Sequence, residues 1–217
     1  MGRVGDGSIA EDVVAAYRAL AVDGLITGTA GNVSARAGRG MLITPSAVPP
    51  LAVAPTDLCE LDLTTGLVSS GTPSSEWLLH LGIYCAGDAG AVVHTHSLAA
   101  TAVSLVAAEL PAVHYYINRL GGPVPVVPYA TYGSQELADA VAAGLHGRHA
   151  VILANHGAVT TGADVTAAVE RARLLEWIAE LYLKAAAVAP PRTLERAELD
   201  AVRAQPARIA ERGYQLG

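Results

Sequence analysis

Three of the seven histidines stand where they could bind a metal ion. His94 and His96 are two residues apart in a stretch that predicts a strand over 92–96, so both side chains project from the same face. His156 follows a second predicted strand over 150–154, and side chains at strand ends often form sites. Neutral imidazoles suit zinc and related divalent ions, and three protein ligands leave one position for substrate. The alternative is that these histidines are ordinary polar residues at a sheet edge.

Glu76 directly follows the segment Pro73-Ser74-Ser75 at the predicted start of a helix. An acidic residue there often does no more than interact favourably with the helix dipole. A helix start with two hydroxyls is also a ready anion pocket, because its backbone N–H groups point outward. Residues 29–32 and 44–46 form two further loops rich in hydroxyl and amide groups. Each loop alone is more often a turn, but together they could hold a phosphate without arginine.

The remaining histidines have no pattern that favours a metal ion. His80 lies one turn after Glu76 on an apolar helix face, which favours a structural or supporting position. His146 and His149 bracket a Gly-Arg pair in a predicted loop and are expected to be solvated. His114 precedes two tyrosines and is expected to be a neighbour of the site rather than a ligand.

Apolar periodicity and turn residues predict the elements that would position these side chains. A capping box of Ser8 and Glu11 begins the first helix. Helices are expected at 8–23, 73–86, 98–108, 134–145, 164–188 and 194–203, and strands at 33–36, 41–44, 58–63, 92–96, 124–127 and 150–154. Strands mixed with helices without regular alternation predict one layered α/β or α+β domain over residues 1–217.

Composition excludes several classes of protein. The chain has 217 residues, 52% hydrophobic and 16% charged, which favours a folded core over disorder. No apolar run approaches the ~20 residues that cross a bilayer, and the acidic residues near the N-terminus do not fit a secretory signal, so we expect a cytoplasmic protein. The net charge of −6 and scattered bases argue against nucleic-acid binding. Cys59 and Cys85 are expected to be buried, reduced thiols.

An ordered series of short motifs resembles the class II aldolase/epimerase family over nearly the whole chain, from about Glu11 to Tyr214. The motifs are Gly28-Thr29-Ala30-Gly31-Asn32-Val33-Ser34, Leu42-Ile43-Thr44-Pro45-Ser46, Pro73-Ser74-Ser75-Glu76, His94-Thr95-His96-Ser97, Tyr129-Ala130-Thr131 and Asn155-His156-Gly157. The resemblance implies a three-layer αβα fold with a largely antiparallel central sheet. It also implies a cyclic homotetramer with active sites between neighbouring subunits.

The resemblance assigns roles to individual residues. It implies one zinc ion per subunit, bound by His94, His96 and His156, with Glu76 as acid/base that also touches the metal in the empty site. The substrate phosphate would be held by Thr29, Asn32, Ser46, Ser74 and Ser75. Tyr115 would reach into the next subunit's site to handle a proton, and Tyr132 and Tyr214 would shape the aldehyde end. Ala47 departs from the family pattern, which has a glycine there. The difference bears on the backbone of this phosphate loop, because alanine cannot freely adopt positive φ.

The implied reaction is cleavage of a ketose 1-phosphate, L-fuculose 1-phosphate or a related deoxyketose 1-phosphate, to dihydroxyacetone phosphate and an aldehyde through an enediolate. A lysine Schiff base is disfavoured because the only lysine, Lys184, lies late in a predicted helix. Alternatives within the family are a methylthioribulose-1-phosphate dehydratase, an oxo-acid phosphate decarboxylase and a ribulose-5-phosphate 4-epimerase. The epimerases typically have Asp where this chain has Glu76. A non-catalytic adducin-like interaction domain is a further alternative.

Overall fold

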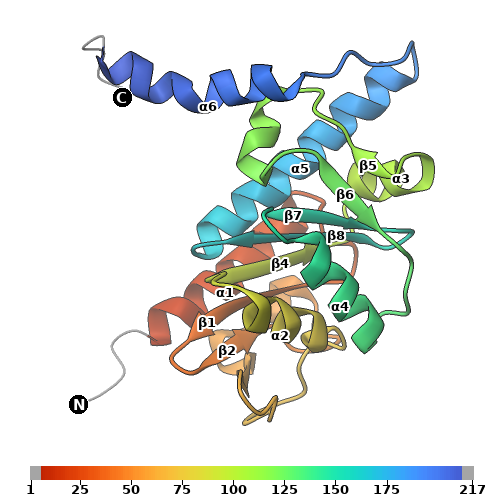
Figure 1. Ribbon diagram of the computed structural model, residues 1–217. Coiled ribbons are helices and arrows are strands. Elements are labelled where there is room, and N and C mark those ends of the chain that lie inside the picture. Colours follow the sequence, from red (N-terminus) through yellow and green to blue (C-terminus); the bar gives the residue numbers. More distant parts are fainter. Residues whose placement is uncertain (1–5, 212–217) are drawn as a thin grey trace.

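A central eight-stranded sheet organises the protein, whose computed structural model describes the chain from residue 6 to residue 211 (Figure 1). The strands lie in the order β3-β2-β1-β4-β8-β7-β6-β5, and every neighbouring pair is antiparallel except β6 and β7. Their bounds are β1 Gly31–Ala37, β2 Gly40–Ile43, β3 Cys59–Asp62, β4 Ala91–Thr95, β5 Glu109–Leu110, β6 Val124–Val127, β7 Ala150–Leu153 and β8 Gly157–Gly162.

Helices cover both faces of the sheet, which confirms the three-layer, largely antiparallel architecture (Figure 1). The α-helices are α1 Asp6–Val22, α2 Trp77–Ala86, α3 Leu98–Val106, α4 Gln135–Gly144, α5 Val165–Ala186 and α6 Arg196–Glu211, and three 3₁₀ turns are η1 Pro50–Ala52, η2 Pro55–Asp57 and η3 Tyr115–Leu120. No helix within residues 6–211 combines the length and apolar character needed to cross a bilayer.

Alternation along the central strands divides the core between the two helix layers. In β4, Val93 packs in the cluster that contains α1 and the first half of α5, whereas Val92 packs with α2 and α4. His94 has the parity of Val92, so its side chain projects toward α2. Asn32 of β1 lies directly opposite His94 in the register and shares that face. The sheet register therefore brings two polar side chains under the start of α2.

The central strand β8 was not expected from the sequence. Its six residues are all buried, with β4 on one side and β7 on the other. Gly157, its first residue, crosses β4 so closely that a Cβ atom would overlap the carbonyl oxygen of Thr95. His156 therefore lies in the tight turn between β7 and β8, with the β-hairpin holding it beside the end of β4.

Three other expectations need correction. Helix α1 begins at Asp6, so Ser8 lies inside the helix and does not start it with a capping box. Cys85 is exposed, whereas Cys59 is buried as expected. The last helix, α6, runs to Glu211 and is longer than the expected 194–203. The other expected helices and strands are present with boundaries shifted by a few residues.

Candidate active site

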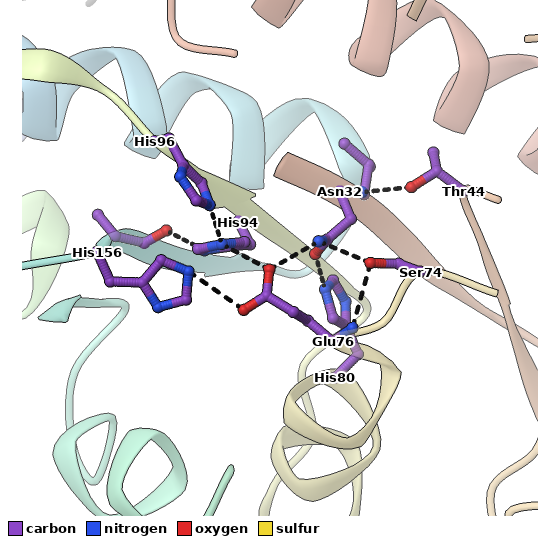
Figure 2. Close-up of polar contacts among 10 residues, drawn as sticks. Asn32, Thr44, Ser74, Glu76, His80, His94, His96 and His156 are labelled. Carbon is purple, nitrogen blue, oxygen red and sulfur yellow. Dashed lines mark hydrogen bonds and ion pairs between the residues drawn. The ribbon is translucent and has the colours of Figure 1, made fainter. Parts of the chain in front are cut away.

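Four side chains from separate parts of the chain meet at one end of the central strands (Figure 2). His94 is the penultimate residue of β4, His96 is the first residue after that strand, His156 occupies the β7–β8 turn, and Glu76 is the residue before the first turn of α2. The potential ligand atoms all lie within 4.8 Å of one another. Each pair of imidazole rings meets edge to face, with centroids 4.7–4.9 Å apart.

The distances within this group suit a single small cation. His94 Nε2 lies 2.9 Å from Glu76 Oε2 and 3.0 Å from His96 Nε2, and His156 Nε2 lies 3.3 Å from Glu76 Oε1. Ligands at zinc-bond distance in a tetrahedron are ~3.3 Å apart, so these spacings are close to those of a zinc site.

Two details of hydrogen bonding fit a divalent cation. Glu76 Oε1 is buried and accepts no hydrogen bond from the described residues, and a buried carboxylate oxygen without a partner is costly. His94 Nδ1 donates to the carbonyl oxygen of Ala158 at 3.0 Å, which leaves the Nε2 lone pair facing the cluster. The four side chains therefore offer an unsatisfied anion and an oriented imidazole at the same point.

Electrostatics favour the protonation states that metal binding requires in Glu76, His96 and His156, but not in His94. Burial raises the pKa of the Glu76 carboxyl, but the nearby His94 and His156 and a hydrogen bond from Asn32 outweigh it, and the pKa lies below its usual range. Burial and the neighbouring imidazoles lower the pKa of His96 to about 4, and the same causes lower the pKa of His156. His94 differs, because Glu76 overcomes the effect of burial and raises its pKa. An ionised carboxylate and neutral imidazoles are the forms that bind metal.

A cavity of about 370 Å³ opens beside the four residues. It is lined by all five residues expected to hold phosphate, Thr29, Asn32, Ser46, Ser74 and Ser75, and also by Tyr132. Tyr115 does not line it: this side chain is 44% exposed and stacks on His114. Tyr214 lies outside the described residues.

Ser74 has a hydroxyl hydrogen available for an anion. Its oxygen accepts from Asn32 Nδ2 at 2.9 Å and from the Glu76 backbone N–H at 3.3 Å. A serine hydroxyl has two acceptor positions and one donor, so with both acceptors in use the O–H remains free to donate. Ser74 is nearly buried at the cavity wall, and its donor therefore suits an oxygen of a bound anion.

Ala47 and Asn155, both at the cavity wall, have left-handed backbones with φ of 58° and 57°. Alanine thus adopts at position 47 the conformation that a glycine would adopt more easily. Asn155 precedes His156 and was quoted in a sequence motif without a role, as was Tyr129, which also lines the cavity. The tolerance of asparagine for left-handed backbone was the signal for a tight turn there.

The other histidines lie outside the candidate metal-binding group, and His114 is not among the residues that line the cavity. His80 is fully buried on α2 and contacts Asn32 (Figure 2) and also Ser34. His146 and His149 are exposed, and His114 stacks on its tyrosine neighbours. Lys184 pairs with Glu180 on α5 and is not among the residues that line the cavity.

Comparison with known proteins identifies the family of this chain. Residues 11–183 match the family model described as the Class II Aldolase and Adducin N-terminal domain. The chain belongs to the class II aldolase family.

Individual relatives of this class II aldolase are similar over most of their length. An L-fuculose phosphate aldolase of Escherichia coli O6:H1 is 41% identical over 170 residues, 77% of this chain and 79% of that protein. A 5-methylthioribulose-1-phosphate/5-deoxyribulose-1-phosphate aldolase of Rhodospirillum rubrum is 38% identical over 192 residues, 88% of this chain and 87% of that one. A solved structure of L-fuculose 1-phosphate aldolase superposes with a TM-score of 0.86 at 32% identity and covers 93% of this chain and 95% of its own. The protein is thus a lyase with a group of residues suited to a divalent metal.

Proposed function

We propose that this class II aldolase cleaves a deoxyketose 1-phosphate, such as L-fuculose 1-phosphate or 5-deoxyribulose 1-phosphate, to dihydroxyacetone phosphate and an aldehyde. The observation that carries the proposal is a cation-ready group of three imidazoles and one carboxylate at the wall of a cavity that also exposes hydroxyls for an anion. The two relatives described above are aldolases of sugar 1-phosphates, which supports this substrate class.

We further propose that His94, His96 and His156 hold one zinc ion per subunit, together with Glu76 before substrate enters. The ion would supply Lewis-acid stabilisation of negative charge on the substrate oxygens. Glu76 would transfer the proton at the carbon next to the carbonyl, because its ionised carboxylate lies at the cavity wall. A Schiff-base route has no support, since Lys184 is the only lysine and points elsewhere.

The remaining roles concern substrate orientation. Thr29, Asn32, Ser46, Ser74 and Ser75 would hold the phosphate by hydroxyl and backbone donors, with the free Ser74 O–H as the clearest donor. Tyr132, on the cavity wall, would contact the aldehyde end, and Tyr214 is proposed for the same end.

We also propose a cyclic homotetramer of single-domain chains, in which Tyr115 of one subunit completes the neighbour's site. Tyr115 is half-exposed and outside its own cavity, which supports a role across an interface. A cytoplasmic location stays a prediction.

The decisive assay measures dihydroxyacetone phosphate released from L-fuculose 1-phosphate, 5-deoxyribulose 1-phosphate and 5-methylthioribulose 1-phosphate. Release from at least one supports the proposal; consumption without release indicates a dehydratase or an epimerase and contradicts it. The variant Glu76→Gln should lower kcat by about 10²–10⁴ while retaining zinc, because it removes the proton acceptor and keeps the shape. Unchanged turnover in this variant would remove Glu76 from its proposed role.

A further inference from the structure

A chain of buried polar side chains leads away from Glu76 into the protein, and Figure 2 shows its first links, from Glu76 to Asn32 and from Asn32 to His80. Asn32 contacts Glu76 Oε2 at 3.3 Å and His80 Nε2 at hydrogen-bond distance. His80 Nδ1 lies 2.6 Å from Ser34 Oγ, which lies 2.9 Å from the Tyr84 hydroxyl. All five side chains are at most 5% exposed. None of the reaction steps proposed above uses His80, Ser34 or Tyr84.

The donor and the acceptor of every hydrogen bond in this series of side chains can be assigned by starting from Glu76. The ionised Glu76 carboxylate only accepts, so Asn32 must present its NH₂ group to Oε2. The Asn32 carbonyl oxygen then faces His80 Nε2, which must carry the proton and donate. A neutral imidazole with a proton on Nε2 accepts at Nδ1, so Ser34 donates to it and accepts from Tyr84. Burial lowers the pKa of His80 to about 3, which keeps the ring neutral, and the hydrogen-bond partners on its two nitrogens then select the tautomer.

The chain makes the two oxygens of Glu76 different. Oε2 accepts from Asn32 and lies 2.9 Å from His94 Nε2, whereas Oε1 has no hydrogen bond from the described residues and lies 3.3 Å from His156 Nε2. A rotated Asn32 amide would present its own oxygen to Oε2, and repulsion between the two acceptors would release the carboxylate. The orientation of the Asn32 amide therefore acts together with the contacts from His94 and His156 to orient the Glu76 carboxylate.

We propose that His80 is a positioning residue: fixed with its proton on Nε2 by Ser34 and Tyr84, it locks the Asn32 amide and so holds Glu76 with Oε2 restrained and Oε1 free. On the function proposed above, Oε1 is then the atom that exchanges the proton with substrate. The restraint itself does not depend on that function, because it also determines how the carboxylate meets a cation. Outer hydrogen-bond partners of metal ligands typically change metal affinity 10–100-fold when they are lost.

The direct test is nitrogen-15 NMR of the histidine rings in the full-length protein, metal-free and zinc-loaded. The expected result is a neutral His80 with its proton on Nε2 in both forms. A proton on Nδ1, or a mixture of tautomers, would overturn the proposal. This measurement needs neither a variant nor a substrate.

Two variants of similar size separate the two ring nitrogens. His80→Gln places an amide NH₂ near the former Nε2 and keeps a donor for Asn32, whereas His80→Asn keeps a group only near the former Nδ1. The Kd for zinc should be at least tenfold larger in H80N than in H80Q. Where the wild type is active, kcat should also be lower in H80N than in H80Q, with KM similar in the two variants. A difference below tenfold would overturn the proposal.

Leu79→Ala is the matched control, because Leu79 is the buried neighbour of His80 on α2 and takes no part in the hydrogen bonds that link Glu76 to Tyr84. L79A should lower the stability of the protein without changing the Kd for zinc. If L79A loses as much zinc affinity as H80N, the loss in H80N is a general structural effect, and the positioning role of His80 is overturned. If the wild type cleaves no ketose 1-phosphate, the proposed function fails, while the tautomer and zinc affinities still decide the role of His80.

Discussion

The substitution Ala47→Gly should stabilise the protein, although replacing alanine by glycine usually does the opposite. Ala47 has φ 58°, and the left-handed region costs an L-residue about 1–2 kcal/mol. Glycine avoids this cost but increases the freedom of the unfolded chain, which costs about 0.4–1 kcal/mol. The difference is about 0.8 kcal/mol, equivalent to a Tm increase of about 2–3 °C in a chain of this size.

Differential scanning calorimetry of the metal-free protein at one fixed concentration would measure this shift. Gly87→Ala is the matched control, because Gly87 has φ −158° and a Cβ atom there would lie 4.0 Å from the nearest heavy atom, the Ile83 carbonyl oxygen. This reverse exchange should also raise Tm, through the entropy of the unfolded chain alone. The reasoning is refuted if Ala47→Gly leaves Tm unchanged or lowers it while Gly87→Ala behaves as expected.

Three further outcomes are expected. Chelation should abolish activity and lower Tm, and zinc at a hundredfold excess over its Kd should restore about 2.7 kcal/mol of stability in a thermal-shift titration; no shift would exclude a bound cation. Gly157→Ala should cost about 3 kcal/mol or more in urea unfolding, because the new Cβ would overlap the Thr95 carbonyl oxygen, whereas a cost below 1 kcal/mol would contradict the close crossing of the strands. His80 has a pKa of about 3 when folded and ~6.5 when unfolded, so the unfolded state takes up its proton first. Its contribution to stability is therefore complete above pH 6.5 and falls by about 1.4 kcal/mol per pH unit down to pH 3, and metal-free His80→Gln should show a shallower acid loss.

Local patterns in the sequence predicted most helices and strands, because the surface helices carry apolar residues at helical spacing and Ser134 and Asp164 cap two of them. Strand β8 was missed for a physical reason. It is buried on both faces and has a glycine at each end, so it shows neither alternation nor an apolar run. Only its pairing with β4 and β7 makes it a strand.

The side chains of the candidate metal centre could be picked out by type and spacing, but their convergence could not. His94 and His96 were expected to share a face, whereas the approach of His156 depends on a hairpin whose second strand was not foreseen. The bonds from Asn32 to Glu76 and from His80 to Asn32 each join residues more than 40 positions apart. The position of Cys85, expected inside and found exposed, depends likewise on which face of α2 meets the sheet.

Strand directions place the turn between β1 and β2 at the end of the sheet opposite the candidate metal centre. Strand β1 starts beside the metal-binding residues and ends at the turn that leads into β2, where Gly38 and Arg39 are both exposed. A peptide tag or a fluorescent label inserted there would sit a full strand length from the cavity. The same turn is a natural place to open the chain for circular permutation, since Gly38 and Arg39 are exposed and are not among the residues that line the cavity.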